Sequence, residues 1–222
     1  MTRPAGWPSW APDPPTARQC EWYREEQGYP VFREPYDLNL LISRSEAVGQ
    51  FDDVATWWWY DRDGRVGSWS CVVTSSAWAH PDGGEWVHHT HPAGCVYIVD
   101  QHCPGAYRPG LHNSRLALRQ QDDRHMLYVR WPPGRGRAPT VPELEALPRF
   151  RAYCGTHMHD RASARRPDRP ARDDSEGCVV YWSRADRDHA HQLIERQIVH
   201  VGSDVVSPTF VRRSILDREC PA

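Results

Sequence analysis

The apolar residues of this 222-residue chain come in short runs, each bounded by Pro, Gly or Asp. These runs lie at residues 38–43, 56–60, 66–73, 95–99, 116–118 and 126–131. Short runs of this kind, separated by turn residues, are typical of a mostly antiparallel sheet that is curled or sandwiched. We therefore predict a mainly β fold, of the β-rich α+β class.

Three local patterns refine this prediction. Asp63-Gly64 lies between two of the runs and supplies the positive φ that a hairpin turn needs. Residues 183–201 are predicted to form one late helix, since Ser183 and Asp186 fit a capping box and Gly202 follows as a stop signal. Residues 142–147 give a weaker helix signal. The triplet Trp57-Trp58-Trp59 is expected to face the core on one side and the surface on the other.

Composition excludes several function classes. All 27 basic residues are arginine, so a lysine nucleophile, a Schiff base and a P-loop lysine are excluded. The formal net charge of −2 disfavours a nucleic-acid partner. The chain has neither an apolar run long enough to span a membrane nor a recognisable secretory signal. We expect synthesis in the cytoplasm, with a separate exit route for any work at the cell wall.

The chain is expected to divide into a Pro-rich N-terminal arm, residues 1–30, and one domain, residues 31–222. Five prolines fall within the first 15 residues, which indicates irregular structure. Trp7 and Trp10 are the residues by which this arm would pack on the domain. The seven cysteines form no CxxC pair, and their odd number excludes a complete disulfide framework. At least one thiol is therefore free.

The segments around His159 and Cys178 carry the chemistry. His157 and His159 alternate along an expected strand, so both side chains point to one face. Cys178 follows Gly177 in an expected tight turn and precedes a β-branched run. A cysteine with an imidazole within reach is a nucleophile–base pair. The backbone amides of Gly177 and Cys178 would donate to an oxyanion.

This pattern resembles the catalytic segment of the L,D-transpeptidases, the YkuD-like domains. In that family a His-Gly pair precedes a Ser-His-Gly-Cys turn, and here His159 precedes Ser175-Glu176-Gly177-Cys178 at a similar spacing. The resemblance implies that Cys178 is the nucleophile and His159 the general base. It implies that the backbone carbonyl of Asp160 orients the imidazole. Ser175 and Gly177 shape the turn, no cofactor is needed, and the substrates are peptidoglycan stem peptides.

A divergent, phage-type branch of the family supplies further similarities. They are Arg44-Ser45, Phe51-Asp52-Asp53 and Gly110-Leu111-His112, so the resemblance covers roughly residues 38–200. We expect His112, His157 and Glu176 to line the substrate groove, and His157 is the alternative general base. Departures from the family pattern are Glu176 for the histidine of the turn, Val180 for an arginine and Asp160 for a glycine. They leave the acyl acceptor open, an amine or water.

Other readings of the chain remain. The same site fits a peptidoglycan hydrolase, and an idle site fits a phage or bacterial structural protein. A zinc hydrolase built on His157 and His159 is a further alternative. The cluster His88-His89-Thr90-His91, near His102 and Cys103, invites a metal interpretation, but adjacent histidines on a strand point apart. We therefore expect no metal there. The arginine-rich loop at residues 161–172 is expected to be a solvated loop.

Overall fold

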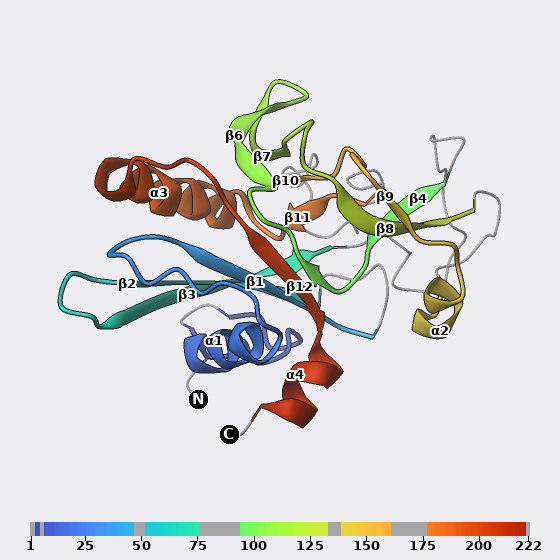
Figure 1. Ribbon diagram of the computed structural model, residues 1–222, viewed down its shortest axis with the longest axis horizontal. Coiled ribbons are helices and arrows are strands. Elements are labelled where there is room, and N and C mark those ends of the chain that lie inside the picture. Colours follow the sequence, from blue (N-terminus) through green and yellow to red (C-terminus); the bar gives the residue numbers. More distant parts are fainter. Residues whose placement is uncertain are drawn as a thin grey trace.

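The computed structural model describes residues 3–4, 7–46, 52–75, 94–132, 139–160 and 177–220. Strands dominate these residues (Figure 1), and the predicted mainly β class is confirmed. The strands are β1 (Asn39–Arg44), β2 (Asp53–Tyr60), β3 (Val66–Thr74), β4 (Cys95–Ile98), β5 (Gln101–His102), β6 (Tyr107–His112), β7 (Arg115–Gln120), β8 (Met126–Trp131), β9 (Phe150–Ala152), β10 (His157–Asp160), β11 (Val179–Tyr181) and β12 (Pro208–Arg212).

Nine of these strands form one sheet, in the order β5-β12-β1-β2-β3-β11-β10-β7-β6. Most neighbours are antiparallel, while β1 with β12 and β10 with β11 are parallel. The predicted hairpin is confirmed: β2 and β3 pair along their length, and Gly64 in the turn has a φ of 75°. A second sheet has the order β4-β8-β9.

Helices cover both faces of the large sheet. α3 (Arg184–Val201) is the predicted late helix; its cap is Ser183, whose hydroxyl accepts the N–H of Asp186 at 3.0 Å, and left-handed Gly202 ends it. Figure 1 shows α3 on one side of β1 to β3, with α1 (Ala17–Glu26) and α4 (Arg213–Glu219) on the other. The short α2 (Val141–Glu145) lies beside the small sheet and matches the weaker helix signal.

The tryptophan triplet is buried on both faces, so the expectation of one surface-facing side was wrong. Trp57 belongs to the main core, together with residues of α3 such as Leu193. Trp58 points the opposite way and packs with Cys20 of α1 and Leu216 of α4. Both indoles are fully buried because helices cover both faces of the sheet.

The N-terminal segment departs from the predicted irregular arm. Its second half forms α1, which starts with a capping box between Thr16 and Gln19. Within the described part of the first half, Trp7 packs against a small cluster that includes Val180. Trp10 meets Trp182 edge to face, with ring centroids 5.1 Å apart. The arm therefore packs on the domain through both tryptophans, as expected.

Among the described residues, no helix has the length and apolar character needed to cross a membrane.

Candidate functional site

Pairing of β10 with β11 places Cys178 beside the histidine-bearing strand. The two strands are parallel, with Met158 opposite Val179, so Cys178 comes just before β11 at the level of His157. The backbone N–H of His157 donates to the Cys178 sulfur at 3.4 Å. A hydrogen bond donated to sulfur favours the thiolate over the thiol, because the charged form is the better acceptor.

The ring of His159 is oriented by the backbone of the next residue. Its Nδ1 lies 2.7 Å from the carbonyl oxygen of Asp160, the contact that the family resemblance implied. A carbonyl oxygen only accepts, so Nδ1 carries the hydrogen and Nε2 is the unprotonated nitrogen of the neutral ring. One coordinating atom each from His112, His159 and Cys178 lies within 4.8 Å of the others.

His112 joins the site from the end of β6. Its ring centroid lies 4.5 Å from that of His157 and 5.2 Å from that of His159. The contacts confirm that His157 and His159 face the same side of the sheet. The Arg119 side chain passes close to Gly110. A Cβ on Gly110 would lie only 3.0 Å from Cδ of Arg119. Three imidazoles and one thiol thus converge from β6, β10 and the turn before β11.

His157 differs from His159 in what its ring does. Its Nδ1 accepts the backbone N–H of Gln120 at 3.1 Å, so that nitrogen is unprotonated. Burial, with the neighbouring His112 and Arg119, lowers the pKa of His157 to about 4. His157 is therefore a neutral, structurally anchored imidazole that lines the site.

Gly177 fixes the turn that presents Cys178. Its φ is +134°, a conformation that residues with a side chain rarely adopt. A Cβ at this position would come within 2.5 Å of the carbonyl oxygen of Val96 in β4. The β-branched run that follows is buried, as expected. Gly177 thus lies between the large sheet and the small one.

Two supporting residues were not identified from the sequence. Arg187 of α3 donates to the Asp160 carboxylate at 2.9 Å, and both side chains are buried. This ion pair anchors the residue whose carbonyl orients His159. The Gln120 side chain accepts the N–H groups of Cys154 and Thr156, just before β10. Neither role has a local sequence signal, because each depends on pairing between distant segments.

None of the seven cysteines forms a disulfide, and they differ in their surroundings. Cys20, Cys71, Cys95 and Cys103 are buried in the core. Cys154 is partly exposed, but its thiol donates to Gln120 Oε1 at 3.5 Å, and burial raises its pKa. Cys178 is also partly exposed, and in its contact with His157 the sulfur accepts. The two thiols thus differ in their partners, Gln120 and Thr156 for Cys154 and the His157 backbone for Cys178. Cys220 is the third partly exposed cysteine, and burial raises its pKa.

Several residues named from the sequence lie outside the described residues. They are Ser175 and Glu176 of the turn, Phe51, the histidines 88, 89 and 91, and the arginine-rich loop at residues 161–172.

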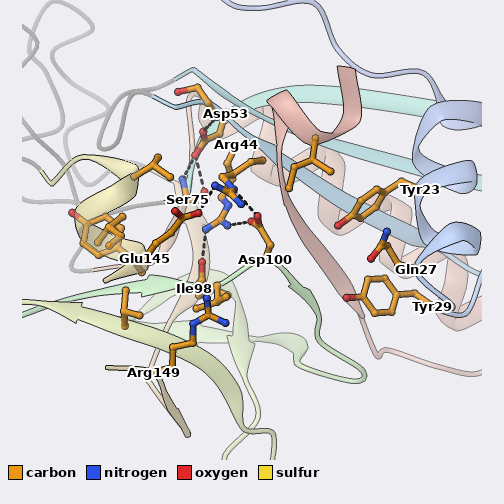
Figure 2. A pocket seen from close by; sticks show the side chains of 18 residues that line it. Tyr23, Gln27, Tyr29, Arg44, Asp53, Ser75, Ile98, Asp100, Glu145 and Arg149 are labelled. Atoms are coloured by element: carbon orange, nitrogen blue, oxygen red, sulfur yellow. Dashed lines mark hydrogen bonds and ion pairs between the residues drawn. The ribbon is translucent and has the colours of Figure 1, made fainter. Parts of the chain in front are cut away.

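A separate cavity of about 390 Å³ lies between the two sheets, α2 and the α1–α4 side of the molecule. Figure 2 shows Arg44 directed at Asp100 and at the carbonyl oxygen of Ile98, both of which its guanidinium contacts. The other carboxylate oxygen of Asp100 accepts from Arg212 at 2.9 Å. Of the described residues that line this cavity, none belongs to the Cys178 site. It has room for a small organic molecule.

No protein-family model matches this sequence, no curated protein matches it, and no solved structure matches the fold.

Proposed function

We propose that this protein is a cysteine-dependent acyl-transfer enzyme that works through a thioacyl intermediate on Cys178. The observation that supports the proposal is the proximity of the Cys178 sulfur and a ring nitrogen of His159, within 4.8 Å at a partly exposed position. The fixed tautomer of His159 supports the same roles, since it leaves Nε2 as the proton acceptor.

The proposed reaction has two steps. In the first, His159 removes the thiol proton, and the Cys178 sulfur attacks a substrate carbonyl carbon. The negative charge on the carbonyl oxygen would be held by the backbone amides of Gly177 and Cys178, each worth about 3 kcal/mol in the transition state. His159 then returns the proton to the leaving amine as the carbon–nitrogen bond breaks. In the second step, an acceptor attacks the thioester and releases Cys178.

The proposed donors are peptidoglycan stem peptides, as the resemblance to L,D-transpeptidases implies. Such peptides carry carboxylates, which guanidinium groups bind in a bidentate way. Arg119, whose charge acts on both His112 and His157, supplies a guanidinium near the site. An amine acceptor makes the enzyme a transpeptidase, and water as acceptor makes it a hydrolase of the same linkage.

The test is the mass of the intact protein after incubation with a carbapenem, a β-lactam whose carbonyl acylates nucleophilic cysteines. We expect a single adduct, which is absent in Cys178→Ala and retained in the matched variant Cys154→Ala. His159→Gln should slow acylation by a factor of about 10²–10⁴, the usual contribution of a general base.

The remaining candidates give different results. Release of peptide from muropeptides without new cross-links identifies the hydrolase. Absence of the adduct, together with slow alkylation of Cys178 at neutral pH, contradicts the proposal and favours a structural protein with an idle site.

A further inference from the structure

We propose that His112, His159 and Cys178 form a binding site for a thiophilic divalent cation, for which Zn²⁺ is the best match. Their coordinating atoms lie within 4.8 Å of one another. In a tetrahedral zinc site, bonds of about 2.0–2.3 Å place neighbouring ligand atoms about 3.3–3.6 Å apart. The widest separation in the cluster therefore needs to close by little more than 1 Å.

Two of the three ligands are prepared for a metal by their hydrogen bonds. The Nδ1–H of His159 is fixed on the carbonyl oxygen of Asp160, the arrangement by which zinc-binding histidines are usually oriented. With the hydrogen on Nδ1, Nε2 is the ring nitrogen that would coordinate a cation. The Cys178 sulfur accepts the N–H of His157, and this contact favours the thiolate, the form that binds metals.

The third ligand, His112, is placed to adjust. It ends β6 and precedes the tight β6–β7 turn at Asn113 and Ser114, both with positive φ. The ring is partly exposed and contacts the rings of His157 and His159, and its Nε2 lies 3.3 Å from Nδ2 of Asn113 in the adjoining turn, a contact that a metal would replace. A small rotation of this side chain would bring its ring nitrogen closer to His159 and Cys178.

The chemistry of this ligand set favours zinc over hard cations. One thiolate and two imidazoles suit Zn²⁺, whereas Mg²⁺ and Ca²⁺ require oxygen ligands. Three protein ligands leave a fourth position open to solvent or to a small molecule. This set also differs from a zinc site on His157 and His159, because Nδ1 of His157 is occupied by the N–H of Gln120.

Binding has a consequence for the proposed acyl transfer, and this consequence alone rests on the proposed function. A cation on the Cys178 sulfur and on Nε2 of His159 takes up the electron pairs of the nucleophile and of the base. Zn²⁺ is then a reversible inhibitor that chelation removes.

The test uses Co²⁺ as a spectroscopic probe, followed by displacement with Zn²⁺. We expect a single equivalent of Co²⁺ to give the near-ultraviolet charge-transfer band of a cobalt–thiolate bond and the visible bands of a four-coordinate site. Cys178→Ser should abolish the charge-transfer band. His112→Gln should weaken Zn²⁺ binding at least about tenfold. The matched variants Cys154→Ser and His200→Gln should bind as the unmodified protein does.

Several results would overturn the proposed metal site. Absence of saturable binding, a spectrum without the thiolate band, or unchanged affinity in His112→Gln contradicts the metal site. Binding that survives Cys178→Ser places the cation elsewhere on the chain, and it too overturns the proposal.

Acylation by the carbapenem, measured in chelator and again with Zn²⁺, separates this inference from the proposed function. Acylation in chelator without metal binding supports the proposed enzyme and refutes the metal site. Metal binding with no acylation in chelator supports the metal site and refutes the proposed enzyme. Acylation that Zn²⁺ suppresses in proportion to its occupancy supports both.

Discussion

The backbone torsion of Gly177 decides where the Cys178 sulfur lies. Gly177, at φ +134°, leads into Cys178 and β11, and the missing side chain lets the chain pass the backbone of Val96. An alanine here has to accept both an unfavourable torsion and a steric clash with a backbone oxygen. Position 177 thus couples the packing of the small sheet to the chemistry of the neighbouring thiol.

Gly177→Ala is therefore expected to lower the free energy of unfolding by about 2–4 kcal/mol and to slow the alkylation of Cys178. Denaturant unfolding and the rate of reaction with iodoacetamide measure the two effects. Gly64→Ala is the control: φ is also positive, but a Cβ there meets nothing within 4 Å. It should cost about 1–2 kcal/mol and leave the thiol rate unchanged. Equal effects of the two substitutions would count against the clash.

Asp53 is a second residue whose surroundings affect the stability of the protein, in this case through its pKa. It is buried, it accepts N–H groups from Ser45 and Ser75, and it accepts the Ser75 hydroxyl. Burial, with the nearby charge of Asp52, raises its pKa from 3.8 to about 6. The folded state therefore holds the Asp53 proton more tightly than the unfolded state does.

This raised pKa makes the protein less stable as the pH rises. The stabilising contribution of the protonated carboxyl is complete below about pH 4 and is lost as the pH passes through about 6. The full difference is about 3 kcal/mol. Asp53→Asn should flatten the fall in unfolding free energy between these pH values, while Asp63→Asn, at the exposed turn, should not. Parallel pH profiles for the unmodified protein and Asp53→Asn would refute the assignment.

At the scale of elements, the sequence predicted the turns and helix ends whose signals come from residues adjacent in the chain. The hairpin turn at Gly64 and the cap and stop of α3 are such cases. α1 was not predicted, because the prolines before it suggested irregular structure, although Thr16 and Gln19 form a capping box. The neighbours of β10 were not predictable from the sequence, since strand order depends on contacts between residues far apart in the chain.

The contact between α3 and β10 gives the prediction at this scale. Arg187 and Asp160 form a buried pair, and removing one partner leaves the other charge uncompensated. Arg187→Met should lower the free energy of unfolding by about 3–5 kcal/mol. The double variant Arg187→Met/Asp160→Leu should regain most of that loss.

Asp188→Asn is the control for this pair. Asp188 also bonds Arg187, but its side chain is 48% exposed, so its loss should cost less than about 1 kcal/mol. Unfolding in denaturant measures all three variants. A double variant no more stable than Arg187→Met would show that the pair is not the source of the loss.

At the scale of the whole molecule, the candidate site is assembled from segments that the sequence keeps apart. The expected pairing of Cys178 with His159 came from one sequence motif, and the structure places the two side chains together. The position of His112 next to them follows from the pairing of β7 with both β6 and β10. The N-terminal arm also reaches this region, where Trp7 and Cys178 pack against the same cluster of Ala11, Val72 and Val180.

The junction of the two sheets depends on one carboxylate. Arg44 and Arg212 are direct neighbours in the parallel pair β1–β12, so two positive charges lie side by side. Asp100, which follows β4, accepts from both guanidinium groups, one on each carboxylate oxygen. Arg44 also donates to the carbonyl oxygen of Ile98 in β4. The large sheet and the small sheet are thereby joined at the floor of the cavity in Figure 2.

Asp100→Asn should therefore destabilise the junction, because it leaves two adjacent guanidinium groups without their shared counter-charge. We expect a loss of about 2–4 kcal/mol in the free energy of unfolding, measured by denaturant titration at low salt. Added salt should reduce the loss by screening the repulsion. Glu145→Gln is the matched control, since Glu145 bonds the same Arg212 but is 51% exposed, and it should cost less than about 1 kcal/mol. If the two substitutions destabilise the protein equally, Asp100 does not hold the sheets together through its charge.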